Sequence, residues 1–355
     1  MAATTSLPAT LRTGWADRFA VDPGYLNAAT SGIPPLTAAA ALREALATWE
    51  TGHANAADYD AAVARSRSLY AGLVGVPEDL VAVGSQTSVF ASLVAGSLPD
   101  GAEVVVVEGD FTSMTFPFMV HADRGVTVRH VPLPALADAL TPRTALVAVS
   151  LVQSACGTVA DLDAVLAAAA RVGARTFVDV TQAAGWLPFD ASRVDYSVNS
   201  GYKWLLGPRG TAFFTVRREL LDSLRPATAG WYAGEDVWSS TYGPAMNLAA
   251  GARRFDVSPA WLSWVGAVPG LELITEIGVP ALHEHGTALA AAFRDGLGLP
   301  QPERPSPVVA LCREGAAERL TEAGVRAAVR AGKVRLAFHL WNTIDDVDRA
   351  LAALA

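Results

Sequence analysis

The chain has 355 residues, of which 51% are hydrophobic and 17% are charged, a composition that excludes a mainly disordered protein. The formal net charge of -8 and the lack of a basic tract exclude a typical nucleic-acid-binding protein. No apolar run approaches the roughly 18–20 residues of a membrane span, and Met1–Trp15 has no apolar core of the signal-peptide type. The two cysteines exclude a disulfide framework. We therefore expect a globular, cytoplasmic enzyme with no membrane partner.

Helical and strand-like segments alternate over the first two thirds of the chain. Apolar residues at helical spacing predict helices at Leu36–Glu50 and Ala57–Val74, and Asp161 is expected to cap a helix that ends at Arg171. Short apolar runs predict strands at Leu80–Val83, Glu103–Val107, Val126–Val131, Ala145–Leu151, Arg175–Val180, Asp195–Val198 and Ala212–Val216. This order predicts an α/β fold, in which a mostly parallel sheet is covered by helices on both faces.

The pattern changes in the last third of the chain. Thr228–Gly251 is rich in Gly, Ser, Trp and Tyr and is typical of a long functional loop. Ser258 and Pro259 predict the start of helices that continue to about Asp295. The proline-rich stretch Leu299–Pro307 predicts a linker into a smaller α+β domain.

The small domain is expected to contain strands at Val308–Cys312 and Val334–Phe338, followed by a helix that a capping box at Thr343–Asp346 begins. We therefore divide the chain into an N-terminal arm and substrate loop (1–35), a large domain (36–255), and interdomain helices with the small C-terminal domain (256–355). His283 and His285 lie two residues apart, on different faces of a helix, so we predict a solvated helix there and no metal site.

The segment from Asp195 to Gly210 carries the strongest chemical signal. Its Lys203 is one of two lysines in the chain, the other being Lys333, and it lies among aromatic and apolar neighbours after a strand. Such surroundings lower the pKa of an amine, which suits Schiff-base chemistry. Ser200 and Tyr202 provide hydroxyls for a phosphate; the alternative is a lysine–aromatic loop at the surface.

Two further segments supply polar groups at strand ends. Asp179 and Gln182 follow a buried strand, where ligands of open α/β sheets bind, although Asp179 alone is also compatible with a helix cap. The Gly84–Ser88 turn opens a helix, so that backbone N–H groups and the Ser85 and Thr87 hydroxyls are available to a phosphate.

Together these residues resemble the class V branch of fold-type-I pyridoxal-phosphate (PLP) enzymes. The resemblance begins at Tyr25–Gly32, similar to the family's substrate loop, and ends at Val334–Leu336, similar to the strand whose arginine binds the substrate carboxylate. It implies the family's large domain with a seven-stranded sheet. It also implies that Lys203 forms the aldimine with PLP and then moves the Cα proton, while Asp179 pairs with the ring nitrogen.

The resemblance assigns the other site residues as well. For the cofactor, Gln182 would contact the ring oxygen beside Ser154 and Phe111 would stack on the ring. The phosphate would be held by Gln86, Thr87, Ser200 and Tyr202. For the substrate, the implied residues are Arg335, which would bind the α-carboxylate, and Asn27, Ser31 and Tyr232.

The segment Gly230–Glu235 resembles a kynureninase loop in which the tryptophan reaches the phosphate of the neighbouring subunit. The resemblance thus implies that Trp231 binds the cofactor of a second chain, in a homodimer with shared active sites. An aromatic interface anchor is the alternative for Trp231, and it also predicts a dimer.

Departures from the relatives narrow the activity. Kynureninases carry an asparagine near the position of Ser258, and cysteine desulfurases carry a nucleophilic cysteine on a loop that corresponds to Ala323–Lys333, which has none here. The run Tyr202–Leu205 also resembles isopenicillin epimerases and ergothioneine-type C–S lyases. We expect a PLP-dependent lyase for a small amino acid, cleaving a C–S or C–C bond by β-elimination or a related step. The alternatives are a class V aminotransferase, an epimerase, or a non-catalytic binding protein on the same fold. A nicotinamide-dependent oxidoreductase is disfavoured because the glycine fingerprint is missing.

Overall fold

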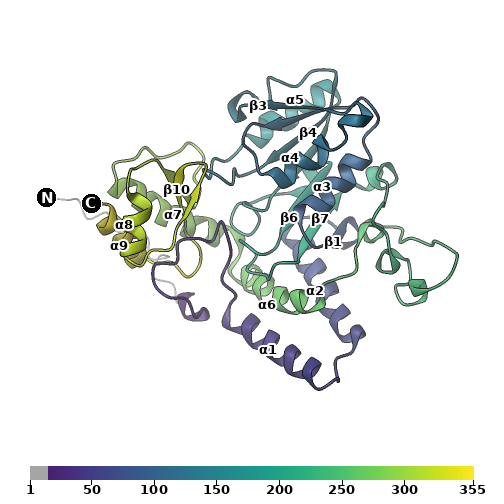
Figure 1. The fold of residues 1–355 in the computed structure, drawn as a ribbon, viewed down its shortest axis with the longest axis horizontal. Helices are drawn as coiled ribbons and strands as arrows, with labels where there is room; N and C mark the ends of the chain where they lie inside the picture. The colour runs from purple at the N-terminus through teal and green to yellow at the C-terminus, as the bar shows by residue number, and fades with distance from the viewer. Residues whose placement is uncertain (1–14) are drawn as a thin grey trace.

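The computed structural model describes residues 15–355, so that of the Met1–Trp15 segment only Trp15 is described. Valine-rich and aromatic runs form the central sheet, since such side chains favour strands that are buried on both faces. Within the described residues this sheet has seven strands in the order β1-β7-β6-β5-β4-β2-β3 (Figure 1). They are β1 (Val81–Gly84), β2 (Glu103–Val107), β3 (Thr127–Val131), β4 (Thr144–Ser150), β5 (Arg175–Asp179), β6 (Tyr196–Ser200) and β7 (Ala212–Val216).

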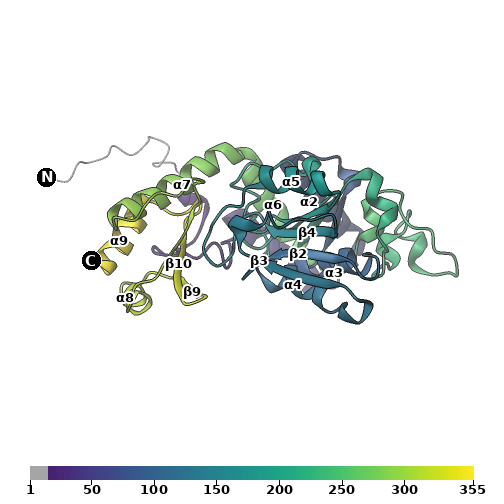
Figure 2. The same ribbon diagram turned by 90° about the horizontal axis from the view of Figure 1, so that it is seen from above.

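The sheet is parallel except at β7, which runs antiparallel to both β1 and β6. Helices α2 (Ala56–Val74), α5 (Leu162–Val172) and α6 (Trp261–Ile277) supply side chains to the core on one face. On the other face lie α3 (Thr87–Gly96) and α4 (Thr112–Met119) (Figure 2). The predicted α/β fold with a mostly parallel seven-stranded sheet is therefore confirmed, although α4 was not predicted from the sequence.

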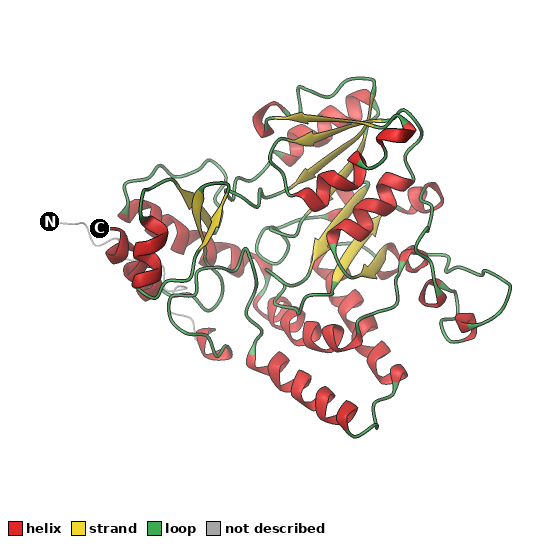
Figure 3. Cartoon of the chain, in the orientation of Figure 1, coloured by secondary structure: helices red, strands yellow, loops and turns green. Residues whose placement is uncertain are grey.

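A second, smaller sheet lies beside the first and carries the C-terminal part of the chain (Figure 3). Its antiparallel strands have the order β8-β10-β9 within the described residues: β8 (Val308–Leu311), β9 (Ala328–Arg330) and β10 (Lys333–Ala337). Around it lie α7 (Val279–Gly296), α8 (Ala316–Glu322) and α9 (Ile344–Leu354). The capping box at Thr343 and Asp346 is present as predicted, whereas α8 and β9 were not predicted. The division of the chain at residues 255 and 256 stays a prediction. Helix α6, which follows that boundary, packs into the core of the large sheet.

One predicted helix start is wrong. Helix α6 begins at Trp261, and its N-cap is Ala260 without a side-chain cap, so Ser258 does not cap it. The preceding residues are held by tertiary contacts: the Asp256 carboxylate is buried against Arg67, and Val257 N–H donates to Val83 O on β1 at 3.4 Å. The helix therefore begins two residues later than predicted, with its N-cap at Ala260 instead of Ser258.

Two other expectations need correction. The helix at His283 and His285 is not fully solvated, since His285 is 2% exposed and its Nε2 lies 3.3 Å from His339 O. Cys312 follows the last residue of β8 and is exposed, rather than forming the end of that strand.

Two predicted loop regions have the expected character. Thr228–Gly251 contains two short 3-10 turns, at Trp231–Ala233 and Ser239–Thr241, and one isolated antiparallel bridge between Gly234 and Leu248. The stretch Leu299–Pro307 joins α7 to β8 without forming a helix or strand. No described helix is by itself long and apolar enough to cross a membrane; α6 and α7 meet the criterion only as a pair, bent by 87°.

Candidate active site

Three neighbouring strands of the large sheet end at one pocket. The last residues of β4, β5 and β6 are Ser150, Asp179 and Ser200, and all three side chains line it. The carboxyl edge of a parallel sheet is where α/β proteins bind their ligands. The other lining residues are Gln86, Thr87, Phe111, Ser113, Val152, Ser154, Thr181, Gln182, Tyr202, Lys203 and Arg209. The structure thus brings together most of the residues that the sequence analysis assigned to the cofactor.

Lys203 lies on a tight turn directly after β6. Gly207 N–H donates to Gly201 O at 3.0 Å, and Leu206 adopts a left-handed φ of 62° although it is not glycine. The substrate loop closes on the same turn, because Gly32 N–H donates to Tyr202 O at 2.9 Å. A Cβ atom at Gly32 would lie 2.1 Å from the carbonyl oxygen of Lys203, so only glycine fits there. The turn is therefore held in one conformation from two sides.

The Lys203 amine is buried among aromatic rings and charges. Its Nζ lies 5.3 Å from the ring centre of Phe111 and 5.5 Å from that of Tyr202. Burial lowers the pKa of Lys203 to about 8; the Asp179 carboxylate opposes this shift, while the charges of Arg335, Arg209 and Arg330 add to it. A larger fraction of this amine is unprotonated near neutral pH than of an ordinary lysine, as a nucleophile requires.

Asp179 is a buried carboxylate at the end of β5. Its Oδ1 accepts a hydrogen bond from Thr181 N–H at 2.8 Å. Burial raises the pKa of Asp179 to about 6, against the opposing effects of Thr181 and of the Lys203 charge. Such a carboxylate gains from a cationic partner, and a protonated ring nitrogen is one.

Gln182 is held by contacts on both ends of its amide. Its Oε1 accepts a hydrogen bond from the Trp204 indole at 2.7 Å. Its Nε2 donates to Ala29 O at 2.8 Å and to Ser154 Oγ at 3.2 Å. Trp204 therefore orients the amide of Gln182 toward the pocket. The predicted contact with a ring oxygen would require Nε2 to exchange one of these acceptors.

A cluster of buried hydroxyls lies at the start of α3. Thr87 N–H donates to Ser200 Oγ at 3.2 Å, and the two hydroxyl oxygens are 2.9 Å apart. Thr181 Oγ1 accepts from Ser200 N–H at 3.0 Å. Hydroxyls at a helix N-terminus suit a phosphate, and Gln86, the N-cap of α3, lies at the exposed edge of the cluster.

Arg335, on β10 of the small sheet, lies beside the pocket and contacts Ser154, which lines it. Its Nη2 donates to Thr30 Oγ1 at 2.7 Å, and its Nη1 donates to the carbonyl oxygen of Ser154 and to Ser154 Oγ at 3.3 Å. The residue is 1% exposed, and burial lowers the pKa of Arg335 to about 10. Asn27 lies on the adjoining substrate loop, with a buried Oδ1 that has no hydrogen-bond partner among the described residues.

Five predicted residues do not line this pocket: Arg335 and Asn27, which lie close to it, and Ser31, Tyr232 and Trp231. Ser31 is exposed and its hydroxyl donates to Gly32 O. Tyr232 is buried elsewhere, and its hydroxyl donates to Asp60 Oδ1 at 3.1 Å, so within one chain the structure does not bring it to the substrate side. Trp231 packs on Tyr232 with ring centres 5.3 Å apart, and its role at a second chain's cofactor stays a prediction.

Sequence reasoning missed several residues that shape the site. Asp110 is buried and accepts hydrogen bonds from Ser150 N–H and from Phe111 N–H, which ties the Phe111 loop to β4. Arg209 lies 4.4 Å from the ring centre of Tyr202. Arg209 lies within the Asp195–Gly210 segment and Asp110 directly precedes Phe111, but their sequence neighbours do not reveal these contacts. In the part of the chain that the structure describes, no three His, Cys, Asp or Glu side chains form a metal-binding group.

The family model for class-V aminotransferases matches residues 25–316. The chain belongs to this family. An uncharacterized aminotransferase, YcbU, of Bacillus subtilis is 31% identical over 311 residues, which is 82% of each chain. The kynureninase of Deinococcus radiodurans is 30% identical over 76% of this chain and 70% of its own. The isopenicillin N epimerase of Streptomyces clavuligerus is 27% identical over 95% of this chain and 96% of its own.

The class V fold is also found in solved structures. The cystine C–S lyase C-DES, in complex with its product cysteine persulfide, has a TM-score of 0.83 at 23% identity and covers 94% of this chain and 97% of its own. These comparisons confirm the expected PLP-dependent class V enzyme. The site of this chain fits the cofactor, because a buried amine, a buried carboxylate and a hydroxyl cluster at a helix N-terminus surround one pocket.

Proposed function

We propose that this class V enzyme is a lyase that cleaves a C–S bond in a small α-amino acid by β-elimination. The observation that carries the proposal is the buried Lys203 amine, with its lowered pKa, which lines one pocket with Asp179 and feels the charge of Arg335, the residue predicted to bind the α-carboxylate. A kynureninase and a cystine C–S lyase are among the similar proteins, and the second is named for cleavage of a C–S bond. A class V aminotransferase or an epimerase is the alternative, favoured by the similarity to YcbU and to the isopenicillin N epimerase.

Three side chains would carry out the steps of this reaction. When bound, PLP supplies a ring that withdraws the electrons left on Cα after its proton is removed. Lys203 would accept that proton at Nζ, since its pKa near 8 leaves a useful fraction of the amine unprotonated. Asp179 would hold the ring nitrogen in its protonated form. Arg335 would bind the α-carboxylate with its planar guanidinium and so orient the Cα–H bond.

The fate of the sulfur follows from the turn between β9 and β10. Ala331 and Gly332 form a two-residue connection with φ angles of 48° and 73°, which leaves no room for a mobile loop. No cysteine lies in Ala323–Lys333. We therefore infer that the Cβ–S bond breaks with the electron pair leaving on sulfur, that the thiol is released, and that water converts the remaining fragment to pyruvate and ammonia. Without a cysteine, this segment has no thiol that could carry the sulfur as a persulfide.

The test is a spectrum of the purified protein with added PLP, followed by a panel of amino acids and S-substituted cysteines. We expect a visible absorbance band from the attached cofactor, and pyruvate released without any keto-acid acceptor. Strict dependence on a keto-acid acceptor would identify an aminotransferase, and loss of optical activity without pyruvate an epimerase. The lack of any band would support the non-catalytic alternative.

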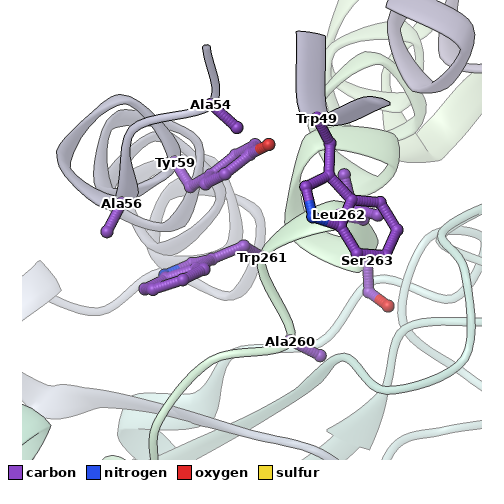
Figure 4. Close-up of a pocket in the computed structure, with 8 residues that line it drawn as sticks. All are labelled: Trp49, Ala54, Ala56, Tyr59, Ala260, Trp261, Leu262 and Ser263. Atoms are coloured by element: carbon purple, nitrogen blue, oxygen red, sulfur yellow. The ribbon is translucent and has the colours of Figure 1, made fainter. Parts of the chain in front are cut away.

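The second part of the proposal is a homodimer in which two chains complete each active site. Apolar side chains are unusually exposed on α1 (Leu36–Glu50) and on the Thr228–Gly251 loop: Trp49 is 62% exposed, Met246 80% and Tyr242 93%. Between α1, α2 and the start of α6 lies a hollow of about 600 Å³ (Figure 4). Tyr59 stacks on Trp261 there, with ring centres 5.6 Å apart, and Trp49 faces them.

Exposed apolar surface of this kind marks association sites. Sedimentation of the wild type and of Trp231→Ala tests the dimer, together with the occupancy of PLP. We expect a dimer that weakens or loses cofactor in the variant; an intact dimer with full occupancy would contradict the predicted role of Trp231. The cytoplasmic location stays a prediction.

A further inference from the structure

The turn between β9 and β10 places cations on one face of the small sheet. Arg335 is paired with Ala328, and Lys333 with Arg330. Directly paired residues share a face of a sheet, as do alternate residues of one strand. Arg330, Lys333 and Arg335 therefore lie on the same face, the one from which Arg335 contacts Ser154 at the pocket.

Two of these guanidinium groups meet at a single hydroxyl. Arg335 Nη2 donates to Thr30 Oγ1 at 2.7 Å, and Arg330 Nη2 donates to the same oxygen at 3.3 Å. Arg335 is buried, whereas Arg330 is exposed, so the pair extends from the interior of the site to its rim. Arg335 also contacts Ser154, which lines the pocket.

Within residues 15–355, neither arginine has a carboxylate partner. The ion pairs within 4.0 Å among the described residues include neither Arg330 nor Arg335. Arg335 Nε is buried and has no hydrogen-bond partner in that part of the chain. The charge of Arg330 adds to the burial that lowers the pKa of Arg335. Two adjacent cations without counter-ions are unfavourable until anions bind.

One α-carboxylate can pair with one guanidinium in the two-pronged manner, which leaves the second cation unmatched. The cofactor phosphate does not supply the second anion, because its predicted site lies at the hydroxyl cluster of Thr87 and Ser200. Arg209, which also lines the pocket, lies over the ring of Tyr202, a residue predicted to hold that phosphate. The remaining source of negative charge is the side chain of the substrate.

We propose that the substrate is an amino acid whose side chain carries a second anionic group, and that Arg330 binds this group while Arg335 binds the α-carboxylate. This inference rests on the proposed function. Because Arg330 is exposed at the rim, it would meet the far end of an extended side chain rather than atoms next to Cα. The leaving thiol is thus expected to be an acidic one.

The test compares two substrates that differ by one charge. S-carboxymethyl-L-cysteine and S-carbamoylmethyl-L-cysteine have nearly the same shape, and only the first has an anionic side chain. With the PLP-loaded enzyme we expect kcat/KM for pyruvate release to favour the acid by roughly tenfold or more, as one charge-assisted hydrogen bond provides. In Arg330→Gln this preference should fall to near unity.

Arg326→Gln is the matched control, because Arg326 is an exposed arginine just before β9 whose guanidinium lies 3.9 Å from Asp22. It should retain the wild-type preference. Equal rates for acid and amide in the wild type, or an unchanged preference in Arg330→Gln, would overturn the inference while the lyase proposal stood. If neither compound yields pyruvate, the lyase proposal fails, and calorimetric Kd values for the same two compounds then test the anion site. Tighter binding of the acid that is lost in Arg330→Gln would support the anion site. Equal binding of acid and amide would overturn it.

Discussion

The two walls of the pocket differ in how their polar groups are satisfied. On the large-domain wall, hydrogen bonds within the chain join Thr181 to Asp179, Thr87 to Ser200 and Trp204 to Gln182. On the small-domain wall, two arginines share one hydroxyl and have no carboxylate among the described residues. We assign the first wall, whose polar groups already hold one another, to the cofactor, and the second wall to anions that the substrate would bring. The large domain thus supports the chemistry that class V enzymes share, whereas we assign substrate choice to the small domain.

Removing the centre of the large-domain wall should have the largest effect. Lys203→Ala is expected to abolish covalent attachment of PLP and to lower kcat roughly a thousandfold or more, because nucleophile and base are both lost. The absorbance spectrum and the mass after borohydride reduction measure this. Lys333→Ala is the control, since it removes the other lysine and should keep the attachment. An unchanged spectrum in Lys203→Ala would refute the assignment.

Disturbing the support behind the same wall should have the next largest effect. Gly32→Ala places a methyl group 2.1 Å from the Lys203 carbonyl oxygen, so the turn must move. We expect about a hundredfold lower kcat/KM, the cost of misplacing a reacting group by about 1 Å. Gly72→Ala is the control, because a Cβ there meets no atom within 4 Å. Equal activity of the two variants would show that the turn tolerates displacement.

On the small-domain wall, Arg335→Ala should raise KM for amino acids with a free α-carboxylate by roughly tenfold to a hundredfold. The reason is the loss of the guanidinium that would pair with that carboxylate. Steady-state kinetics beside Arg326→Ala, an exposed arginine outside the pocket, provide the measurement. The same KM in both variants would place the carboxylate site elsewhere.

The effect of the Asp179 charge on the Lys203 amine should appear in the pH dependence of PLP attachment. The unprotonated Lys203 amine is the reactive form, so the rate at which cofactor-free protein attaches PLP should rise with pH and level off above about 8. The Asp179 charge raises the pKa of Lys203, so Asp179→Asn should move the midpoint to lower pH. Stopped-flow absorbance at saturating PLP tests this smallest effect. A midpoint near that of an ordinary lysine, or a shift to higher pH, would contradict the geometry described here.

Much of the large-domain wall is predictable from the sequence. Lys203 stands out because the chain has two lysines, and Asp179 and Ser200 stand out because each ends a buried strand. Parallel strands carry their carboxyl ends to the same edge, so residues at those ends meet without further information. Local patterns failed where distant contacts compete with them, as at Ser258, where Asp256 and Val257 are held against β1 and its neighbours.

The sequence by itself determined the strands of the large sheet, β8 and β10 of the small one, most helices, the family and Lys203 as the candidate cofactor-binding lysine, because these depend on residues a few positions apart and on motifs. The tertiary structure decided that Arg335 meets Thr30, 305 positions away, and Ser154, 181 positions away. It also decided that Tyr232 binds Asp60 rather than facing the pocket, and that Arg330 joins Arg335. These contacts join residues that are far apart in the sequence, and they form only when the two sheets pack against each other. No local pattern of side chains predicts that packing.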